Sequence, residues 1–397
     1  MTAKHSETEN LKRKELFSRP PAVENSFWEK ALDWAAGKVK DNIPVFKNSY
    51  PAPASINNVY PLIDNNYWTT SFWPGMLWLA WEITGENVFR ETAEARIADF
   101  RSRLEKRIEV ETHDLGFLYT LSCVAPWKLT GSELAKESAI KAADLLMKRY
   151  FEKAGIIQAW GDLNDPGQRG RIIIDCSMNL PLLYWASKET GSPHYKEAAE
   201  QHMRQANRYL IRDNWSSYHT FFFDTESGSP VRGNTAQGYS DDSCWARGQA
   251  WGIYGNALSY KYVRDREFTE YARGLALYFL NRLPEDLIAY WDLVFTNGNE
   301  ERDSSAAAIA ACGLLELSAA LPHTDPDHLL FKNAALHIMA SLASSYTSSA
   351  IPGSNGLLLH GVYSKPDKKG VDECTCWGDY FYLEALVRIA KSWNIYW

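Results

Sequence analysis

Two aspartates in this chain have surroundings that suit acid–base chemistry. Asp175 follows three consecutive isoleucines, so we expect its carboxyl group to be partly buried. Burial raises the pKa of a carboxyl group towards the range of a general acid, and a neighbouring carboxylate raises it further. Asp114 lies one unit earlier in a helical repeat, which predicts that the two carboxyl groups lie on adjacent helices. Paired carboxylates among aromatic side chains indicate glycoside chemistry.

Further polar candidates are concentrated between residues 219 and 251. They are His219, Gln237, Asp241, Asp242, Arg247 and Trp251. Arg247 directly precedes an aromatic-rich helical stretch, and a guanidinium group binds carboxylates in a fork. We therefore expect Arg247 to bind a substrate carboxylate. For His219, a structural role in the core is as good an interpretation as a role in binding a ligand.

The elements that must position these residues follow from a repeat. Three apolar stretches end in Thr-Gly, at Gly85, Gly131 and Gly191, and an amphipathic helix follows each one. The repeat predicts apolar first helices near residues 72–84, 117–129, 177–189, 247–264, 303–320 and 379–394. It predicts second helices near residues 26–41, 88–107, 132–150, 193–211, 266–283 and 326–348. Helices that are apolar on several faces are buried, so we expect an all-α (α/α)6 barrel of six inner and six outer helices. An open helical solenoid is the alternative.

Polar residues stand just before the predicted inner helices. They are Thr69, Thr70, His113, Asp114, Asp175, Arg247, Asp303 and Asp379. If every inner helix begins at one end of the barrel, these side chains converge there, beside helix N-termini that favour an anionic ligand. For each aspartate taken alone, a helix cap is the better interpretation, and it is the convergence of several polar residues that favours a site.

Composition narrows the class of protein. The chain has 397 residues and a formal net charge of −7, which argues against binding to nucleic acid or to a membrane surface. It contains 16 Trp, 21 Tyr and 16 Phe residues. Aromatic rings pack against the C–H faces of sugars, although a bulky core would also use them. We expect a polar lead-in over residues 1–24 and one barrel domain over residues 25–397.

The first residues are charged and lack the apolar run of a secretory signal, so we expect a cytoplasmic protein. Six scattered cysteines fit free thiols in a reducing compartment. The one close pair, Cys374 and Cys376, has no second pair or flanking histidines, so no zinc site is expected.

At these residues the sequence closely resembles the unsaturated glucuronyl hydrolases, bacterial enzymes that act after polysaccharide lyases. The resemblance runs from about residue 25 to Trp397. The motifs that carry it are His113-Asp114-Leu115-Gly116-Phe117-Leu118-Tyr119, Gly155-Ile156-Ile157-Gln158-Ala159-Trp160-Gly161, Ile172-Ile173-Ile174-Asp175-Cys176, Ser217-Tyr218-His219-Thr220, Trp245-Ala246-Arg247-Gly248-Gln249-Ala250-Trp251-Gly252, Arg302-Asp303-Ser304-Ser305 and Trp377-Gly378-Asp379-Tyr380. The fold of that family is the same (α/α)6 barrel.

The resemblance implies a substrate with a 4,5-unsaturated uronic acid at its non-reducing end, derived from chondroitin, hyaluronan or a heparin-type glycosaminoglycan. It implies that Asp175 protonates C4 and then activates the water that adds at C5. Asp114 would hold the sugar ring and raise the proton affinity of Asp175. The implied substrate-binding residues are Trp68, His113, Trp160, His219, Gln237, Arg247, Trp251, Tyr363, Ser364 and Lys369. The implied chemistry needs no metal or organic cofactor.

The segment from Tyr363 to Lys369 departs from the pattern of members that favour sulfated substrates. Ser364 and Lys369 are kept, but Asp367 would repel a nearby sulfate. Lys365 and Lys368 would offset Asp367 only if they pointed inward, and we favour a solvated loop for both. We therefore expect a preference for unsulfated or lightly sulfated disaccharides.

Three rival functions share parts of this pattern. An unsaturated rhamnogalacturonyl hydrolase would use the same fold and carboxylate pair on a pectin-derived substrate. A sugar 2-epimerase would rely on paired histidines instead of carboxylates. A helical scaffold protein would have no need of Asp114 or Asp175, so its function would survive their replacement by asparagine.

Overall fold

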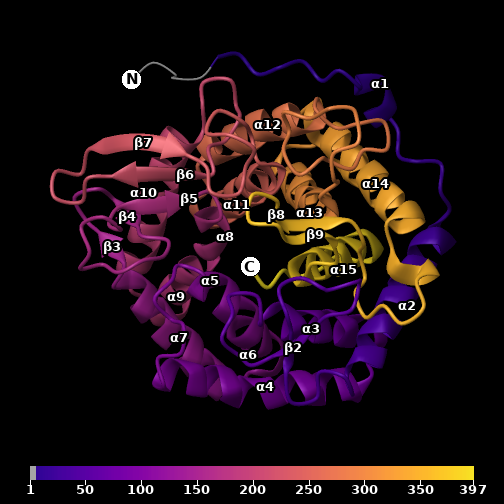
Figure 1. The fold of residues 1–397 in the computed structure, drawn as a ribbon, viewed down its shortest axis with the longest axis horizontal. Coiled ribbons are helices and arrows are strands. Elements are labelled where there is room, and N and C mark those ends of the chain that lie inside the picture. Colours follow the sequence, from indigo (N-terminus) through magenta and orange to yellow (C-terminus); the bar gives the residue numbers. More distant parts are fainter. Residues whose placement is uncertain (1–5) are drawn as a thin grey trace.

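A computed structural model describes residues 6–397 and shows a closed (α/α)6 barrel (Figure 1). The inner helices are α3 (Phe72–Thr84), α5 (Leu115–Tyr119) with α6 (Ala125–Thr130), α8 (Cys176–Asn179) with α9 (Pro181–Thr190), α11 (Ala246–Val263), α13 (Ser304–Ala320) and α15 (Cys376–Ala390). The outer helices are α2 (Asn25–Asn42), α4 (Asn87–Glu105), α7 (Glu133–Met147), α10 (Pro193–Leu210), α12 (Arg266–Leu280) and α14 (Asp327–Ser345). Because α15 packs against both α13 and α3, the inner ring closes, and the open solenoid is excluded.

The repeat predicted the inner and outer sets correctly for a simple physical reason. In α3 and α13 most residues are buried, on every side of the helix, whereas α10 buries only one face. Gly85, Gly131 and Gly191 end three inner helices with φ of 71°, 72° and 74°, a conformation that glycine adopts without steric cost.

Two inner helices are interrupted where the repeat predicted continuous ones. A turn of π-helix, Thr120–Val124, separates α5 from α6. The second break falls at Leu180, immediately before Pro181, which has no N–H group to continue the hydrogen bonding of α8.

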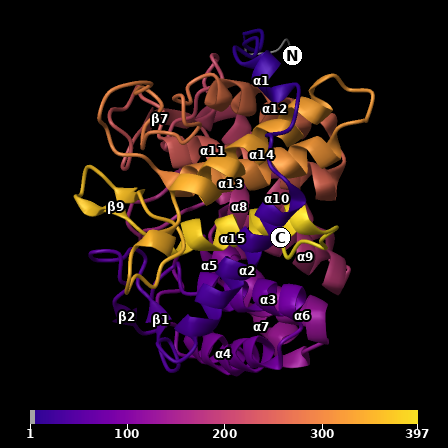
Figure 2. The same cartoon turned by 90° about the vertical axis from the view of Figure 1, so that its right-hand side faces the viewer.

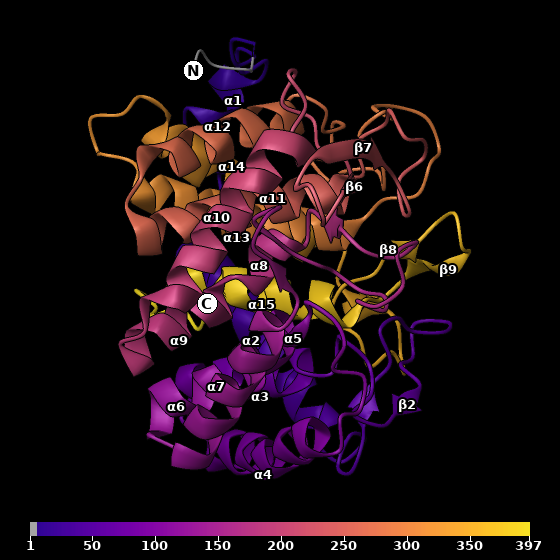
Figure 3. The same ribbon diagram turned by 90° about the vertical axis from the view of Figure 1, so that its left-hand side faces the viewer.

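Short strands, which the sequence did not predict, occupy segments between the helices. They are β1 (Tyr50–Pro51), β2 (Leu62–Ile63), β3 (Tyr150–Phe151), β4 (Ile156–Ile157), β5 (Arg171–Ile173), β6 (Thr220–Phe223), β7 (Pro230–Asn234), β8 (Gly361–Ser364) and β9 (Lys369–Glu373). They form antiparallel sheets in the orders β1-β2, β3-β4, β5-β6-β7 and β8-β9. Each strand lies on a segment that leads from an outer helix to the next inner one, so the sheets gather at the end where inner helices begin (Figures 2 and 3). We call this end the mouth.

The described part of the predicted lead-in lies against the barrel wall. Its short helix α1 (Lys14–Phe17) packs on α14 with Phe17 fully buried, and Glu9 pairs at 2.8 Å with Arg282, which follows α12. Residues 1–5 lie outside the described residues, and the boundary at residue 24 stays a prediction. Within residues 6–397 no helix is long and apolar enough to cross a membrane.

The helices that carry the two aspartates touch at Gly116. A Cβ atom at this position of α5 would lie 2.3 Å from both Cα and the carbonyl oxygen of Asn179 in α8. Backbone atoms cannot move aside cheaply, so we expect Gly116→Ala to lower the free energy of unfolding by roughly 1–3 kcal/mol. The measurement is the urea midpoint of unfolding. Gly37→Ala in α2 is the matched control, because nothing lies within 4 Å of its added Cβ; equal midpoints for the two variants would contradict this packing.

Candidate active site

Asp114 and Asp175 occupy equivalent places at the mouth. Each precedes an inner helix, α5 and α8 respectively, and neither carboxylate makes a side-chain capping hydrogen bond to its own helix. Asp303, by contrast, caps α13 by accepting from the N–H groups of Ser305 and Ala306. The capping interpretation therefore holds for Asp303, while the carboxylates of Asp114 and Asp175 stay available for chemistry.

Asn179 connects the two aspartates. Its amide nitrogen lies 3.4 Å from Asp114 Oδ1 and donates to the carbonyl oxygen of Asp175 at 3.3 Å, and its amide oxygen accepts from the Phe117 N–H at 2.8 Å. Asp175 Oδ1 has no hydrogen-bond partner among the described residues. Asp114 is therefore held by a hydrogen-bonding neighbour, whereas Oδ1 of Asp175 has no partner in the protein.

The surroundings separate the pKa values of the two groups. Burial raises the pKa of Asp175 to about 6, and the charge of Asp114 adds to this effect. Burial also acts to raise the pKa of Asp114, but His113 opposes it. Together with hydrogen bonds from Thr112 and Asn179, His113 holds the pKa of Asp114 below its ordinary value. Near pH 6 one carboxyl group can donate a proton while the other is ionised, which is the arrangement of an acid with an electrostatic partner.

Asp379 shows that a raised pKa alone does not identify the acid. Burial raises the pKa of Asp379 to about 7, yet its oxygens accept from the Tyr60 hydroxyl at 2.9 Å and the Leu358 N–H at 2.8 Å. It is also almost completely buried, whereas the Asp175 residue is partly exposed. Asp379 is therefore a structural carboxyl group and Asp175 an accessible one.

Two predicted histidines lie in the wall beside the carboxylates. His113 Nε2 is 3.3 Å from Asp114 Oδ1, and neither ring nitrogen of His113 has a hydrogen-bond partner among the described residues. His219 Nδ1 accepts from the Ala236 N–H at 3.1 Å, which leaves its proton on Nε2. Burial, with Arg247 and His113 nearby, lowers the pKa of His219 to about 3, so this ring is a neutral donor.

Arg247 does not have the free fork that we expected. Its guanidinium donates to Asp303 at 3.0 Å, to Gln237 Oε1 at 2.9 Å and to the carbonyl oxygens of Val362 and Tyr363. The side chain is buried and lies over the Trp245 and Trp377 rings. Because its donors are engaged inside the protein, Arg247 fastens Gln237 and β8 in place, and the binding of a substrate carboxylate by a fork is not supported.

The predicted aromatic residues divide into surface and core. Trp68 is partly exposed, stacks on Trp377 with ring centroids 5.2 Å apart, and donates to the Tyr363 hydroxyl at 3.1 Å. Trp160 is 37% exposed and pairs through its backbone with Thr112, two residues before Asp114. Trp251 is fully buried against Phe117, so it supports the site from below and has no face open to a ligand.

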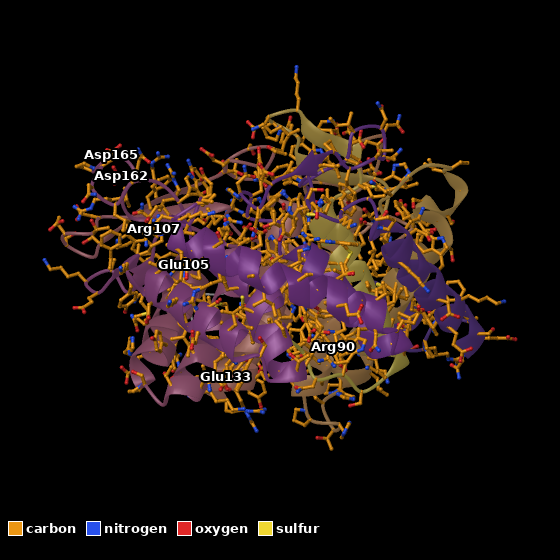
Figure 4. The ribbon with its side chains drawn as sticks, turned by 90° about the horizontal axis from the view of Figure 1, so that it is seen from below. Arg90, Glu105, Arg107, Glu133, Asp162 and Asp165 are labelled. Atoms are coloured by element: carbon orange, nitrogen blue, oxygen red, sulfur yellow. The ribbon has the colours of Figure 1, made fainter. Side chains whose placement is uncertain are left out.

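The predicted residues Ser364 and Lys369 lie on strands β8 and β9. In the β8-β9 hairpin Ser364 is buried, opposite the exposed Lys369, and donates to Asp367 at 2.8 Å. Lys365 forms an ion pair with Glu301. The loop after Trp160 carries Asp162 and Asp165, which stand at the outer edge of the molecule (Figure 4). Within residues 6–397 no group of three or more His, Cys, Asp or Glu side chains is placed to hold a metal ion.

Comparison with known proteins agrees with this geometry. The family model described as Glycosyl Hydrolase Family 88 matches residues 46–350. The chain belongs to this family. It is 46% identical to the unsaturated chondroitin disaccharide hydrolase of Streptococcus pneumoniae over 98% of each chain. The crystal structure of unsaturated glucuronyl hydrolase from Streptococcus agalactiae superposes with a TM-score of 0.97 at 44% identity and covers all of both chains. An aspartate-to-asparagine variant of that enzyme, complexed with dGlcA-GalNAc6S, superposes with a TM-score of 0.89 at 42% identity, again over all of both chains.

The family 88 assignment makes the chain a glycoside hydrolase. Asn179, which contacts both aspartates, is a site residue that the sequence did not predict. The available signal was its spacing: Asn179 follows Asp175 by one helical turn and so shares its side of α8. Asparagine at such a position is also a common structural residue, and no local pattern showed that Asp114 would lie within its reach.

We expect Asn179→Ala to move the acidic limb of the pH profile of kcat/KM to higher pH. Losing the amide removes a group that lowers the pKa of Asp114, so that pKa rises and Asp114 is protonated at a less acidic pH. Stability should fall by about 1–3 kcal/mol, because the buried Phe117 N–H loses its acceptor. Asn333→Ala is the control: its buried amide donates to the Phe17 carbonyl at 2.9 Å, far from the aspartates. If both variants keep the wild-type profile, Asn179 is purely structural.

Proposed function

We propose that this family 88 hydrolase removes the 4,5-unsaturated glucuronic acid from the non-reducing end of oligosaccharides derived from chondroitin, hyaluronan or heparin-type glycosaminoglycans. The proposal rests on the carboxyl group of Asp175. Its Oδ1 has no hydrogen-bond partner among the described residues, and burial together with the charge of Asp114 raises its pKa to about 6. The names of the similar enzymes and the unsaturated disaccharide bound to one of them support this substrate class. The six cysteines are buried free thiols, which supports a cytoplasmic location.

The proposed reaction begins at the double bond and not at the anomeric carbon. Asp175 transfers its proton to C4, and positive charge develops at C5, next to the ring oxygen. The resulting carboxylate of Asp175 then takes a proton from a water molecule whose oxygen bonds to C5. The hemiketal opens to a ketone at C5, and the opened product rearranges and releases the next sugar. Each step needs only a proton donor that becomes a base.

Other residues hold the sugar for this transfer. The ionised Asp114 fixes ring hydroxyl groups and favours the protonated form of Asp175. Trp68 and Trp160 supply partly exposed faces for stacking, and the neutral His219 offers its Nε2 proton. Gln237 and Tyr363 contact the ligand from positions that Arg247 fixes. His113, Ser364 and Lys369 complete the proposed binding set, with Trp251 as its packed floor.

The test follows the ultraviolet absorbance of the conjugated alkene. Purified protein is mixed with unsaturated chondroitin and hyaluronan disaccharides, and with an unsaturated pectin fragment as the alternative substrate. We expect the alkene absorbance of the unsaturated chondroitin and hyaluronan disaccharides to disappear and that of the pectin fragment to persist. Turnover of the pectin fragment alone would identify a rhamnogalacturonyl hydrolase, and no turnover of any substrate would overturn the proposal.

Asp367 should make the enzyme prefer unsulfated disaccharides. The Ser364 hydroxyl already donates to this carboxylate, and Lys365 is paired with Glu301, so neither is free to bind a sulfate group. Two like charges about 4 Å apart in water repel by about 1 kcal/mol, which corresponds to roughly fivefold in rate. We expect kcat/KM to be about fivefold higher for the unsulfated than for the 6-sulfated unsaturated chondroitin disaccharide, and Asp367→Asn to remove the difference. A preference of the wild type for the sulfated disaccharide would refute this expectation.

A further inference from the structure

A row of alternating arginine and aromatic side chains crosses the β5-β6-β7 sheet. Arg171 of β5 pairs with Phe222 of β6, and Phe222 pairs with Arg232 of β7, so the three side chains are neighbours on one face. Both guanidinium groups lie over the Phe222 ring, 5.4 and 5.0 Å from its centroid. Arg171 also lies 4.8 Å from the centroid of the Trp160 ring. We call these four residues the arginine row.

The arginine row occupies the solvent face of this sheet. The alternate residues Ile172 and Phe221 are buried on the face that packs against α10. Arg171 and Phe222 are partly exposed, and Arg232 is exposed. Because successive residues of a strand point to opposite faces, both guanidinium groups are directed away from the core.

The two arginines of the row have no anionic partner in the described part of the chain. No carboxylate lies at ion-pairing distance from Arg171 or Arg232, whereas the nearby Arg169 pairs with Glu226 at 3.0 Å. Burial lowers the pKa of Arg171, and no acidic neighbour opposes this effect. Packing on an aromatic neighbour accounts for either arginine alone. It does not account for two like charges on the Phe222 ring with no carboxylate beside them, because like charges repel.

One end of the arginine row meets the proposed active site. Trp160 pairs through its backbone with Thr112, two residues before Asp114. Arg171 precedes Asp175 by four residues, so their Cα atoms are at most about 14 Å apart. Figure 3 shows β6 and β7 on the same side of the molecule as β8 and β9. A sugar chain that begins at Asp175 and passes Trp160 therefore continues onto the row.

We propose that the arginine row binds the next acidic sugar of a longer substrate, with Arg171 and Arg232 donating to its carboxylate. In the unsaturated chondroitin tetrasaccharide this sugar is the internal glucuronic acid, which the disaccharide lacks. A guanidinium group stacked on a ring keeps its in-plane N–H donors, and a carboxylate accepts two of them at once. The inference rests on the proposed function, because the unsaturated sugar bound at Asp175 sets the direction of the chain.

The test compares the affinities of Asp175→Asn protein for the unsaturated chondroitin disaccharide and tetrasaccharide, measured by calorimetry. We expect the tetrasaccharide to bind about tenfold more tightly, as one charge-assisted contact would give. Adding Arg171→Gln and Arg232→Gln should remove most of this difference. Arg264→Gln is the matched control, because Arg264 is exposed over the Tyr260 ring at the end of α11 away from the mouth. It should keep the full difference.

A modified ligand separates charge from chain length. In a tetrasaccharide whose internal carboxylate has been reduced to an alcohol, the sugar rings remain but the arginines lose their anion. We expect this ligand to bind like the disaccharide. Equal affinities for the natural and the reduced tetrasaccharide would refute the role of the arginine row, and so would absence of tetrasaccharide binding. The absorbance assay on the wild type then shows separately whether the reaction at Asp175 stands.

Discussion

Asp175→Asn should lower kcat for the unsaturated chondroitin disaccharide by a factor of about 10²–10⁴, the contribution expected of a general acid. Asparagine has nearly the shape of aspartate but no acidic proton for C4, and its amide cannot afterwards take a proton from water. The Asp175 oxygen that lacks a partner makes no hydrogen bond whose loss would destabilise the fold. We therefore expect an inactive protein with a thermal midpoint close to that of the wild type, measured by absorbance and circular dichroism.

Asp379→Asn is the matched control for this substitution. Both aspartates have a raised pKa, but Asp379 is held by Tyr60 and Leu358 and is almost completely buried. We expect Asp379→Asn to cost stability and to keep kcat within a few-fold of the wild type in the protein that folds. Retained turnover in Asp175→Asn protein would show that Asp175 takes no part in the chemistry. A comparable loss of kcat in both variants would show that the loss of any buried carboxyl group lowers activity, whatever its position.

Asp114→Asn should both reduce kcat, by about a hundredfold, and displace the alkaline limb of the pH profile. In the wild type Asp175 must be protonated and Asp114 ionised, so kcat/KM is highest between their two pKa values and falls tenfold for each pH unit above the pKa of Asp175 near 6. The charge of Asp114 is one of the causes that raise this pKa. Its removal lowers the pKa, so the alkaline limb moves to lower pH. The measurement is kcat/KM for the unsulfated disaccharide between about pH 4 and 8.

A distant carboxylate separates this local effect from the change in net charge. Asp33 is exposed on the outer helix α2, and Asp33→Asn changes the net charge of the protein by the same amount. Its profile should coincide with that of the wild type. An alkaline limb that stays in place, or moves to higher pH, in Asp114→Asn protein would contradict the electrostatic coupling of the two aspartates.

The helices of the barrel could be predicted because their signals are local and periodic in the sequence. Thr-Gly endings and one-sided helices indicated every inner and outer helix, because both signals depend on residues within a few turns. The strands were missed because they are only two to five residues long. One pairing is also distant in sequence, since Ile172 of β5 pairs with Phe221 of β6. The π-helical turn at Thr120–Val124 left no local signal, whereas the break before Pro181 was readable in the proline itself.

In the candidate site, too, the features that depend on local sequence were predicted and those that depend on distant segments were not. The position of Asp175 behind buried isoleucines predicted its raised pKa, and the repeat predicted that Asp114 would lie nearby. Residue type also suggested a ligand fork for Arg247, but the acceptors that occupy it come from Asp303, Gln237 and the backbone of β8, which only the folded chain brings together.

The most direct test of the account asks whether the reaction occurs at the double bond. A carbon-linked analogue of the unsaturated glucuronide keeps C4 and C5 intact but has no glycosidic oxygen to cleave. We predict that wild-type protein abolishes the alkene absorbance of this analogue, that the product carries a ketone at C5, and that Asp175→Asn protein does neither. If the natural disaccharide is consumed while the analogue keeps its absorbance, catalysis proceeds through the anomeric carbon, and protonation of C4 by Asp175 is wrong.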